Sequence, residues 1–458
     1  MQRLLAIASL TWKAAFRYRL FWVLAGLLLG SVVLLPLLLK DDGTARGFTQ
    51  ILLTYTLSVI TGLLGLSTLW LACGTLARDI EECQIQMVAV KPIARWQIWL
   101  GKWVGILLLN AALLAVAGGS VFVLLHWRAQ RLPPDQQRIL QNEIFVARAS
   151  LKEPVPDIES VVDKVSRERL QKTAVPLSDQ SLVRDQIRQQ IKAGLQVVPP
   201  GFLRRWTIDL GVRKNFLRDQ PLFLKVKFFA AKTNASGTYL GLWQIGPTNS
   251  AQVSSQPMSL AADTFHEFQI PANLFDESGR LTIDFYNRND SALLFPLEEG
   301  LEVLYREGGF GLNYARGLAI ILCWLALLAA LGLSAASLLS FPVAAFFSLS
   351  VLIVALSSGT ISSVVSEGTV MGTDHDTSAG ASHWVDTVMV PLFTLVLKVV
   401  NPVQNFSPIE SLSTGRSITW GQLGLACAHI VLLMGGGVAL VGMAIFNFRE
   451  LATAQGST

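Results

Sequence analysis

Charged residues are scarce in this sequence. Asp, Glu, Lys and Arg make up 15% of the 458 residues and hydrophobic residues make up 52%, whereas soluble proteins carry about 25% charged residues. The apolar residues gather toward both ends of the chain and leave a polar middle at residues 126–312. This distribution excludes an ordinary soluble globular protein, and it predicts membrane-spanning ends around a water-facing domain.

Cysteine is also rare. The chain has four cysteines, and none of them lies in the polar middle, so we expect no disulfide framework. The net charge is +5, but the basic residues flank apolar runs, where they orient membrane helices, and they form no nucleic-acid-binding motif. We therefore expect no nucleic-acid partner.

The phosphate-binding pattern Gly-x-x-x-x-Gly-Lys-Ser/Thr is absent from the chain. A chain without this loop lacks the usual backbone cradle for ATP phosphates, so we expect no ATPase and no cofactor here. No set of residues suggests another enzyme active site. We also expect no cleavable signal peptide, because Lys13, Arg17 and Arg19 interrupt the N-terminal apolar residues.

Six apolar runs are long enough to cross a membrane, which takes about 20 mostly apolar residues. They cover residues 20–39, 51–77, 103–125, 315–339, 341–365 and 421–446. A shorter apolar stretch at 385–400 is bounded by Lys398 and Pro402, and we expect a re-entrant or interfacial helix there. The sequence thus predicts three membrane helices in residues 20–125 and three more in residues 313–458.

The charges of the N-terminal segment predict the orientation. Residues 1–19 include Arg3, Lys13, Arg17 and Arg19 and no acidic residue, and positive charge marks the cytoplasmic side of membrane helices. We therefore expect both termini in the cytoplasm and residues 126–312 outside a bacterial cytoplasmic (inner) membrane. The helical spacing of the segment predicts an amphipathic helix along the inner surface; alternatively, it only extends the first membrane helix.

The polar middle contains two patterns. Helical spacing dominates residues 133–195, and a period of two follows over residues 205–306, so we expect an α+β domain that ends in an antiparallel β-sandwich. Its many aromatic residues are either the filling of the sandwich, which we favour, or a sugar-binding platform. The predicted strands cover residues 206–210, 222–229, 239–245, 265–270, 280–286 and 301–305.

The segment between the second and third apolar runs carries the most informative pattern. It leads from an acidic stretch into three short runs: Asp79-Ile80-Glu81-Glu82, then Lys91-Pro92, Arg95-Trp96 and Gly101-Lys102. This pattern resembles the ABC-2 type permease family. The resemblance extends to the turn Ser340-Phe341-Pro342, to residues 401–416 and to the ending at residues 447–451, and it is closest to the branch that includes gliding-motility and copper-site-maturation transporters.

The resemblance implies a cytoplasmic coupling helix within residues 78–102, which docks into a groove on a separate ATPase subunit that holds the ATP and Mg. It also implies a six-helix, ABC-2 exporter-like fold, a second permease copy and export of a lipid, a glycan or another hydrophobic substrate. The alternative for the segment is a solvated loop with its aromatic residues at the lipid interface. The coupling residues so implied are Arg78, Glu81, Glu82, Met87, Lys91, Pro92, Arg95 and Trp96.

Two groups of histidines are further candidates. His429 lies in the last apolar run, where it either hydrogen-bonds a neighbouring helix or lines a transport pathway. Asp374-His375-Asp376 and His383 have the residue types of a cation site, but the Gly- and Ser-rich surroundings favour a solvated turn, so we expect no metal site.

Two functions compete with transport. In the first, the ATPase drives mechanical work through the membrane on an envelope protein or glycan that contacts the external domain. In the second, the chain is a membrane-anchored binding protein without an ATPase.

Overall fold

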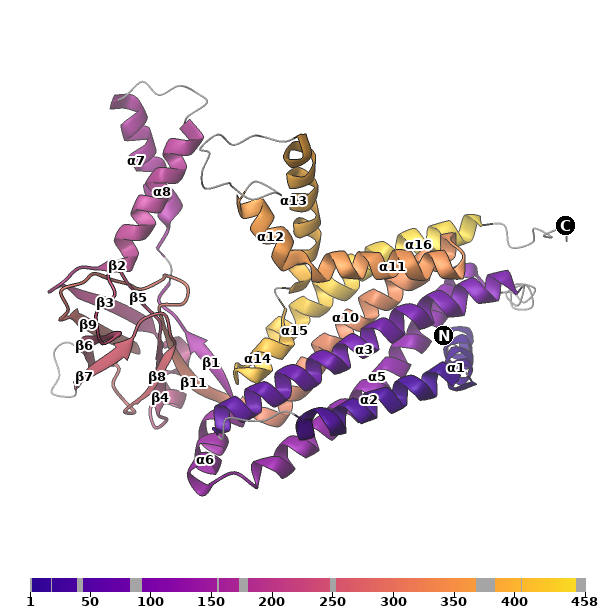
Figure 1. Cartoon of the computed structure of the whole chain (residues 1–458), viewed down its shortest axis with the longest axis horizontal. Coiled ribbons are helices and arrows are strands. Elements are labelled where there is room, and N and C mark those ends of the chain that lie inside the picture. The colour runs from indigo at the N-terminus through magenta and orange to yellow at the C-terminus, as the bar shows by residue number, and fades with distance from the viewer. Residues whose placement is uncertain are drawn as a thin grey trace. The chain divides into compact units, whose positions relative to one another are not determined.

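The long apolar runs of the sequence fold into helices, and the alternating segments of the polar middle fold into strands. A computed structural model describes residues 2–17, 19–38, 44–82, 93–154, 156–172, 180–247, 253–367, 384–404 and 406–449. The chain divides into a helical unit, Met1–Ala147 with Gly308–Thr458, and a β-sheet unit, Arg148–Glu307 (Figure 1). A mostly helical chain with a separate β-sheet domain is thus confirmed.

The helical unit contains long helices joined by short ones. Its elements are α1 (Gln2–Arg17), α2 (Arg19–Leu38), α3 (Ala45–Glu81), α5 (Arg95–Ala129), α6 (Pro134–Ile139), the π-helical η1 (Leu140–Ile144), α10 (Phe310–Leu338), α11 (Phe341–Leu356), α12 (Ser358–Glu367), α13 (Trp384–Gln404), α14 (Pro408–Ser413), α15 (Trp420–Ala426), the π-helical η3 (Cys427–Gly435) and α16 (Gly436–Phe448).

Four helices among the described residues are long and apolar enough to cross a membrane: Gly47–Glu81, Arg95–Ala129, Phe310–Leu338 and Trp420–Phe448. The pair α11 and α12 also qualifies when taken together, but it bends by 54° at its break. The described structure therefore supports a membrane protein with four such helices, or five with the bent pair; the expected number of six is not confirmed. The first expected span corresponds to α2, which has 20 residues and whose searched apolar part is Trp22–Leu35. The stretch near 385–400 lies in α13, whose searched apolar part is Val388–Val403.

Small residues let the long helices approach closely. A Cβ added to Gly332 on α10 would lie 2.7 Å from the Cβ of Ala72 on α3, and one added to Gly105 on α5 would lie 2.8 Å from the Cβ of Thr11 on α1. Such contacts are the usual basis of helix packing in membranes, where lipid removes the hydrophobic drive. The Gly332 contact packs α10 against α3, and the Gly105 contact packs α5 against α1, where Ile7 and Ala8 are buried.

The β-sheet unit is built from antiparallel strands. The strands are β1 (Val146–Leu151), β2 (Val197–Val198), β3 (Leu203–Asp209), β4 (Leu222–Val226), β5 (Phe229–Ala230), β6 (Thr238–Ile245), β7 (Ser254–Ala261), β8 (His266–Ile270), β9 (Arg280–Asn287), β10 (Leu293–Leu294) and β11 (Leu301–Gly309). Two four-stranded sheets have the orders β1-β11-β4-β8 and β3-β9-β6-β7, and β2-β10-β5 forms a third.

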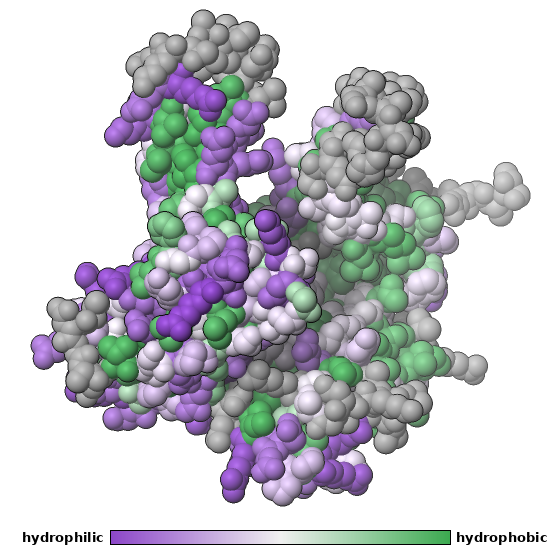
Figure 2. All heavy atoms as spheres, turned by 60° about the vertical axis from the view of Figure 1, so that its left-hand side comes forward, coloured by the Kyte–Doolittle hydropathy of each residue, from purple (hydrophilic) through white to green (hydrophobic). Residues whose placement is uncertain are grey.

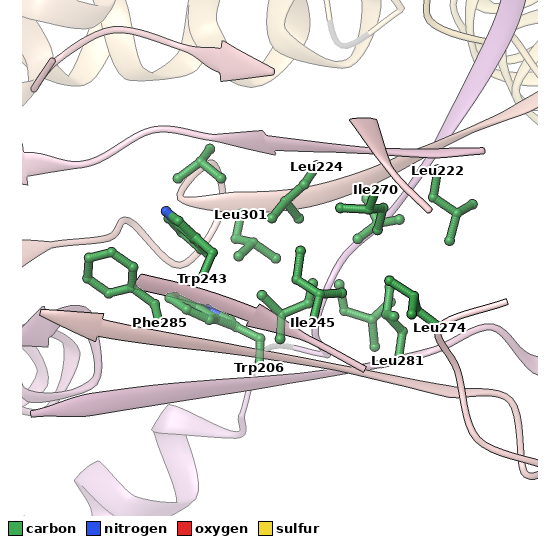
Figure 3. Packing of buried hydrophobic residues seen from close by; sticks show 14 of the residues in the cluster. Trp206, Leu222, Leu224, Trp243, Ile245, Ile270, Leu274, Leu281, Phe285 and Leu301 are labelled. Atoms are coloured by element: carbon green, nitrogen blue, oxygen red, sulfur yellow. The ribbon is translucent and has the colours of Figure 1, made fainter. Parts of the chain in front are cut away.

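The inward residues of both four-stranded sheets share one hydrophobic core. Leu222 and Leu224 of β4 belong to the same buried cluster as Trp243 of β6 and Phe285 of β9 (Figure 3). The Trp243 and Phe285 rings lie 4.6 Å apart between centroids, and both are almost fully buried. The alternation in residues 281–285 therefore does place every second side chain in the core.

The remaining elements of the β-sheet unit are helices. α7 (Ile158–Lys172) and α8 (Gln180–Gln196) pack on each other and bury Val162 and Ile187, and the short η2 (Gly211–Arg213) and α9 (Lys214–Leu217) follow β3. Ion pairs join the two long helices, with Arg188 Nε 2.7 Å from Glu159 Oε1. We call α7 and α8 the hairpin. Figure 2 shows its hydrophobic side chains between hydrophilic ones.

Three features of the polar middle differ from the sequence-based expectation. The expected helical region at 133–195 contains strand β1, and helices α6 and η1 before it belong to the helical unit, because Leu140 and Ile144 pack with Ala45 and Ala129. Strand β7 lies at a sheet edge, the usual position for a strand that contains a proline such as Pro257. It was not predicted, because its polar residues do not form a hydrophobic alternation.

Candidate functional site

The ends of five helices meet around the segment that the sequence singles out. These are the C-terminal ends of α3, α10 and α16 and the N-terminal ends of α5 and α11; we call this region the capped end. Of the eight predicted coupling residues, Arg78, Glu81, Glu82, Arg95 and Trp96 are described here. Met87, Lys91 and Pro92 lie outside the described residues.

Glu81 and Arg78 hold the start of α11. The backbone N–H of Phe341 donates to Glu81 Oε1 at 2.9 Å, so a carboxylate of α3 satisfies one of the unpaired donors at the helix N-terminus. The Arg78 guanidinium lies 4.6 Å from the centroid of the Phe341 ring. The Trp70 ring contacts the same ring edge-on, with 5.1 Å between the two ring centroids. The turn 340–342 is thereby attached to the last turns of α3.

Arg95 holds the end of α16. Its Nη1 donates to the carbonyl oxygens of Asn447 and Arg449, both at 2.8 Å, and more weakly to that of Phe446 at 3.3 Å. Arg449 in turn donates to the carbonyl of Ser337 at 2.9 Å, near the C-terminal end of α10. Cations at helix C-termini satisfy unpaired carbonyls and oppose the helix dipole. Two arginines therefore connect α5 to α16 and α16 to α10.

A buried ion pair joins α3 to α5 in the same region. Lys102 Nζ lies 2.5 Å from Asp79 Oδ2 and 2.9 Å from the carbonyl oxygen of Thr75, and the Lys102 side chain is only 9% exposed. An unpaired charge so deep would be very costly. This pair was not predicted from the sequence, although a lysine inside an apolar helix indicates that a partner is needed.

The capped end also presents exposed side chains. Trp96 is 50% exposed, and Glu81 and Glu82 are exposed at the end of α3. Tryptophan is enriched among the anchor residues of protein interfaces. The capped end therefore combines side chains that fix helix ends with side chains that can contact a partner.

His429 lies on an outward face of the helical unit. It is exposed, and its Nδ1 contacts the carbonyl oxygen of Leu425 in its own helix at 3.0 Å. Its ring lies 6.2 Å from that of Phe406. The neighbouring Leu432 and Leu433 are about 70% exposed, so the structure leaves this apolar face uncovered, and a role of His429 in a pathway stays a prediction.

Most aromatic residues of the β-sheet unit are buried. Trp206, Phe228, Tyr239, Trp243 and Phe285 are each at most 4% exposed. These five belong to the shared core, as favoured from the sequence. Phe229, Phe265 and Tyr286 are 37%, 50% and 39% exposed, so a sugar-binding platform on the surface stays the alternative.

A shallow pocket of about 280 Å³ does lie on the outer face of the β3-β9-β6 strands, beside Tyr286 and Asp284. The Asp284 carboxylate accepts two hydrogen bonds from Arg205, at 2.8 and 2.7 Å, which raise the pKa of that guanidinium. Arg205 and Asp284 thus satisfy each other's hydrogen-bonding groups without a ligand.

The described residues contain no group of three or more metal-binding side chains, and the candidates at 374–376 and 383 fall outside them.

Comparison with family models, curated proteins and solved structures finds no match to this chain.

Proposed function

We propose that this chain is the membrane-spanning permease subunit of an ABC transporter, and that a separate ATPase subunit docks at the capped end. The observation that carries the proposal is the set of contacts from Glu81, Arg95 and Arg449 to the ends of three other helices. A displacement of the segment between α3 and α5 by the ATPase subunit would be transmitted to α3, α5, α10, α11 and α16 together. Rigid-body motion of packed helices is a common way to switch a transporter.

The chain direction supports a six-crossing topology. Lys102 pairs with Asp79 and Ala129 packs with Ala45, so α3 and α5 run antiparallel. Arg316 and Ser334 of α10 donate to Ile418 and Val438, respectively, so α10 and the helix that ends in α16 run parallel. If α2 and the bent pair α11–α12 each count as a crossing, the chain alternates throughout. Both termini and the capped end then lie on one side of the membrane.

We infer from the basic residues of the capped end that this side is the cytoplasm. Lys13, Arg78, Arg95 and Arg449 all belong to this side, and positive charge accumulates on cytoplasmic loops. We therefore place the chain in the bacterial inner membrane, with the β-sheet unit outside, in the periplasm of a Gram-negative cell. We interpret its two four-stranded sheets with their shared core as a β-sandwich.

The resemblance to ABC-2 permeases supplies the assembly and the class of substrate. We propose a homodimer with two ATPase subunits, each holding ATP and Mg, that exports a lipid, a glycan or another hydrophobic molecule. The exposed apolar faces of the helical unit, such as Leu432 and Leu433, are surfaces that lipid or the second copy covers.

Co-purification of the chain from its native membrane tests the docking proposal. Trp96→Ala removes an exposed aromatic anchor at the capped end, so we expect the ATPase subunit and its ATP hydrolysis to be lost from the purified complex. Trp127→Ala is the matched control, because Trp127 lies at the other end of the same helix and is similarly exposed, 48% against 50%. Equal recovery of ATPase with both variants would refute docking at Trp96.

A second candidate function is ATP-driven mechanical work on an envelope partner. It is favoured by the hairpin, where Val161 and Val165 are exposed on helices held together by the Glu159–Arg188 ion pair. ATP-dependent movement of labelled lipid or glycan in vesicles that contain the complex separates the two functions. Hydrolysis without movement favours mechanical work.

A further inference from the structure

A cavity of about 250 Å³ lies within the helical unit among α1, α2, α3 and α5. Most of its wall is aliphatic and comes from Leu24, Leu28, Leu63, Leu64, Leu71 and Leu113. Along α3 it extends from Leu63 to Arg78, which is about 22 Å at 1.5 Å per residue. One leaflet of hydrocarbon is about 15 Å thick, so the cavity has the length and the lining that suit a lipid chain with its headgroup.

One buried polar group in this cavity has no partner. Asn110 of α5 lines the wall and is 2% exposed, and its Nδ2 makes no hydrogen bond within the described part of the chain. The other small polar residues of the wall differ, because Ser67 and Thr75 donate to carbonyl oxygens of their own helix, at 2.9 and 3.3 Å. Since buried polar groups are normally paired, Asn110 is suited to an oxygen acceptor supplied by a ligand.

The end of the cavity at the capped end is cationic and aromatic. Arg78 and Trp70 both line it, and the Arg78 guanidinium packs over the Phe341 ring. An arginine at a membrane boundary binds phosphate or carboxylate through a planar pair of N–H donors, and tryptophan is enriched at the same depth. The cavity thus changes from apolar to cationic along its length. It therefore complements an acidic amphiphile, whose apolar tail would face the leucines and whose anionic head would face Arg78.

We propose that this cavity binds an anionic lipid. Its acidic headgroup pairs with Arg78, one acyl chain lies along the leucines of α2 and α3, and a carbonyl or hydroxyl oxygen of the lipid accepts a hydrogen bond from Asn110 Nδ2. The proposal names a lipid class for the proposed transporter and rests on its membrane placement, but it does not depend on an ATPase partner. The two proposals can therefore fail separately.

Photo-crosslinking in vesicles tests the binding. The full chain is reconstituted with an anionic phospholipid that carries a photoreactive group on its acyl chain, and the labelled peptides are identified by mass spectrometry. We expect labelling of α2 and of residues 63–78. Leu24→Trp fills the cavity and should reduce labelling of residues 63–78 at least fivefold, whereas Leu27→Trp, on the same helix but 54% exposed, should leave it unchanged.

Two further variants test the polar contacts without filling the cavity. Asn110→Leu keeps a similar volume and should reduce the labelling several-fold, because the hydrogen bond is lost. Arg78→Gln should abolish the preference for the anionic probe over a zwitterionic probe with the same chain. Each variant is first shown to be folded by its secondary structure and its monodispersity.

The outcomes are decisive in either direction. Labelling of residues 63–78 that Leu24→Trp and Asn110→Leu both leave intact would overturn the site, since it would reflect lipid on the outer surface. A free fatty acid with the same photoreactive group distinguishes the source of the acidic head: stronger labelling by the phospholipid supports the proposal, and labelling by the fatty acid alone refutes a phospholipid ligand. The ATPase proposal is tested separately, by the Trp96 and Trp127 variants, so labelling of this cavity and loss of the ATPase are distinguishable results.

Discussion

Arg95→Gln tests whether the capped end is held together by helix capping. The substitution removes a guanidinium that donates to two carbonyl oxygens of the α16 end at 2.8 Å and to a third at 3.3 Å. Glutamine is shorter and neutral, so it loses both the bonds and the favourable charge at a helix C-terminus. We therefore expect the last turn of α16 to open more often.

The magnitude follows from the geometry. One charged hydrogen bond contributes about 1.5–3 kcal/mol, and a cation at a helix C-terminus adds about 0.3–1 kcal/mol at exposed sites. A single Nη1 has two protons for three carbonyls, so these bonds are shared, and Arg95 is half-buried. We count one full charged bond, which gives about 2 kcal/mol, or about a 30-fold increase in local opening.

Amide hydrogen exchange measures this opening directly. The exchange of residues 442–449 in the reconstituted chain should become about 30-fold faster in Arg95→Gln. Arg131→Gln is the control, because the Arg131 guanidinium lies 3.8 Å over the exposed Trp127 ring at the opposite end of α5 and contributes about 0.5–1 kcal/mol there. Exchange of residues 442–449 within twofold of the wild type would refute the capping role of Arg95.

Three further predictions concern other parts of the chain. Asp79→Asn leaves Lys102 buried without its counter-ion, so the unfolding free energy in mixed micelles should fall by about 3–5 kcal/mol; a loss below 1 kcal/mol would contradict the ion pair. Gly241→Ala places a methyl group into an aromatic ring of the β core and should cost about 1–3 kcal/mol, seen as faster proteolysis of the β-sheet unit. The Arg188 hydrogen bond lowers the pKa of Glu159 from its ordinary value of 4.5, so the stabilisation is present above that pH and is lost as the pH falls through the lowered pKa. Hydrogen exchange of α7 should therefore differ between the wild type and Arg188→Gln at pH 7 and converge at pH values well below 4.5; a difference that persists there would contradict the assignment.

Controls for these predictions exist in the same chain. A Cβ added to Gly194 on α8 would have no neighbour within 4 Å, so Gly194→Ala should leave the proteolysis of the β-sheet unit unchanged or slow it slightly. Lys102→Met combined with Asp79→Asn removes both charges and should recover most of the lost stability.

The fold was predictable where a single segment decides its own structure. The apolar run 51–77 became α3 and the run 103–125 lies within α5, because an apolar helix in a membrane satisfies its own backbone. Alternation likewise identified β9 from residues 280–286. By contrast, β7 has Pro257 and few apolar residues, and only its position at a sheet edge explains it.

The candidate site was predictable in position but not in its contacts. The sequence directed attention to Arg78, Glu81 and Arg95 through its resemblance to the ABC-2 permeases. Their partners lie far along the chain: Glu81 caps Phe341, 260 positions away, and Arg95 reaches Asn447, 352 positions away. No local pattern encodes such pairs, so residues that were predicted as contacts for a partner turn out to connect helix ends within the chain.

Site-specific photo-crosslinking at Trp96 tests the central proposal most directly. A photoreactive amino acid replaces Trp96 or, in the control, Trp127, and the chain is crosslinked in its native membrane. The account predicts a crosslink from position 96 to a second polypeptide that contains a phosphate-binding loop, together with Mg-dependent ATP hydrolysis in the purified adduct, and no such crosslink from position 127. If position 96 reacts only with lipid while the chain remains folded, docking of an ATPase subunit at the capped end is refuted.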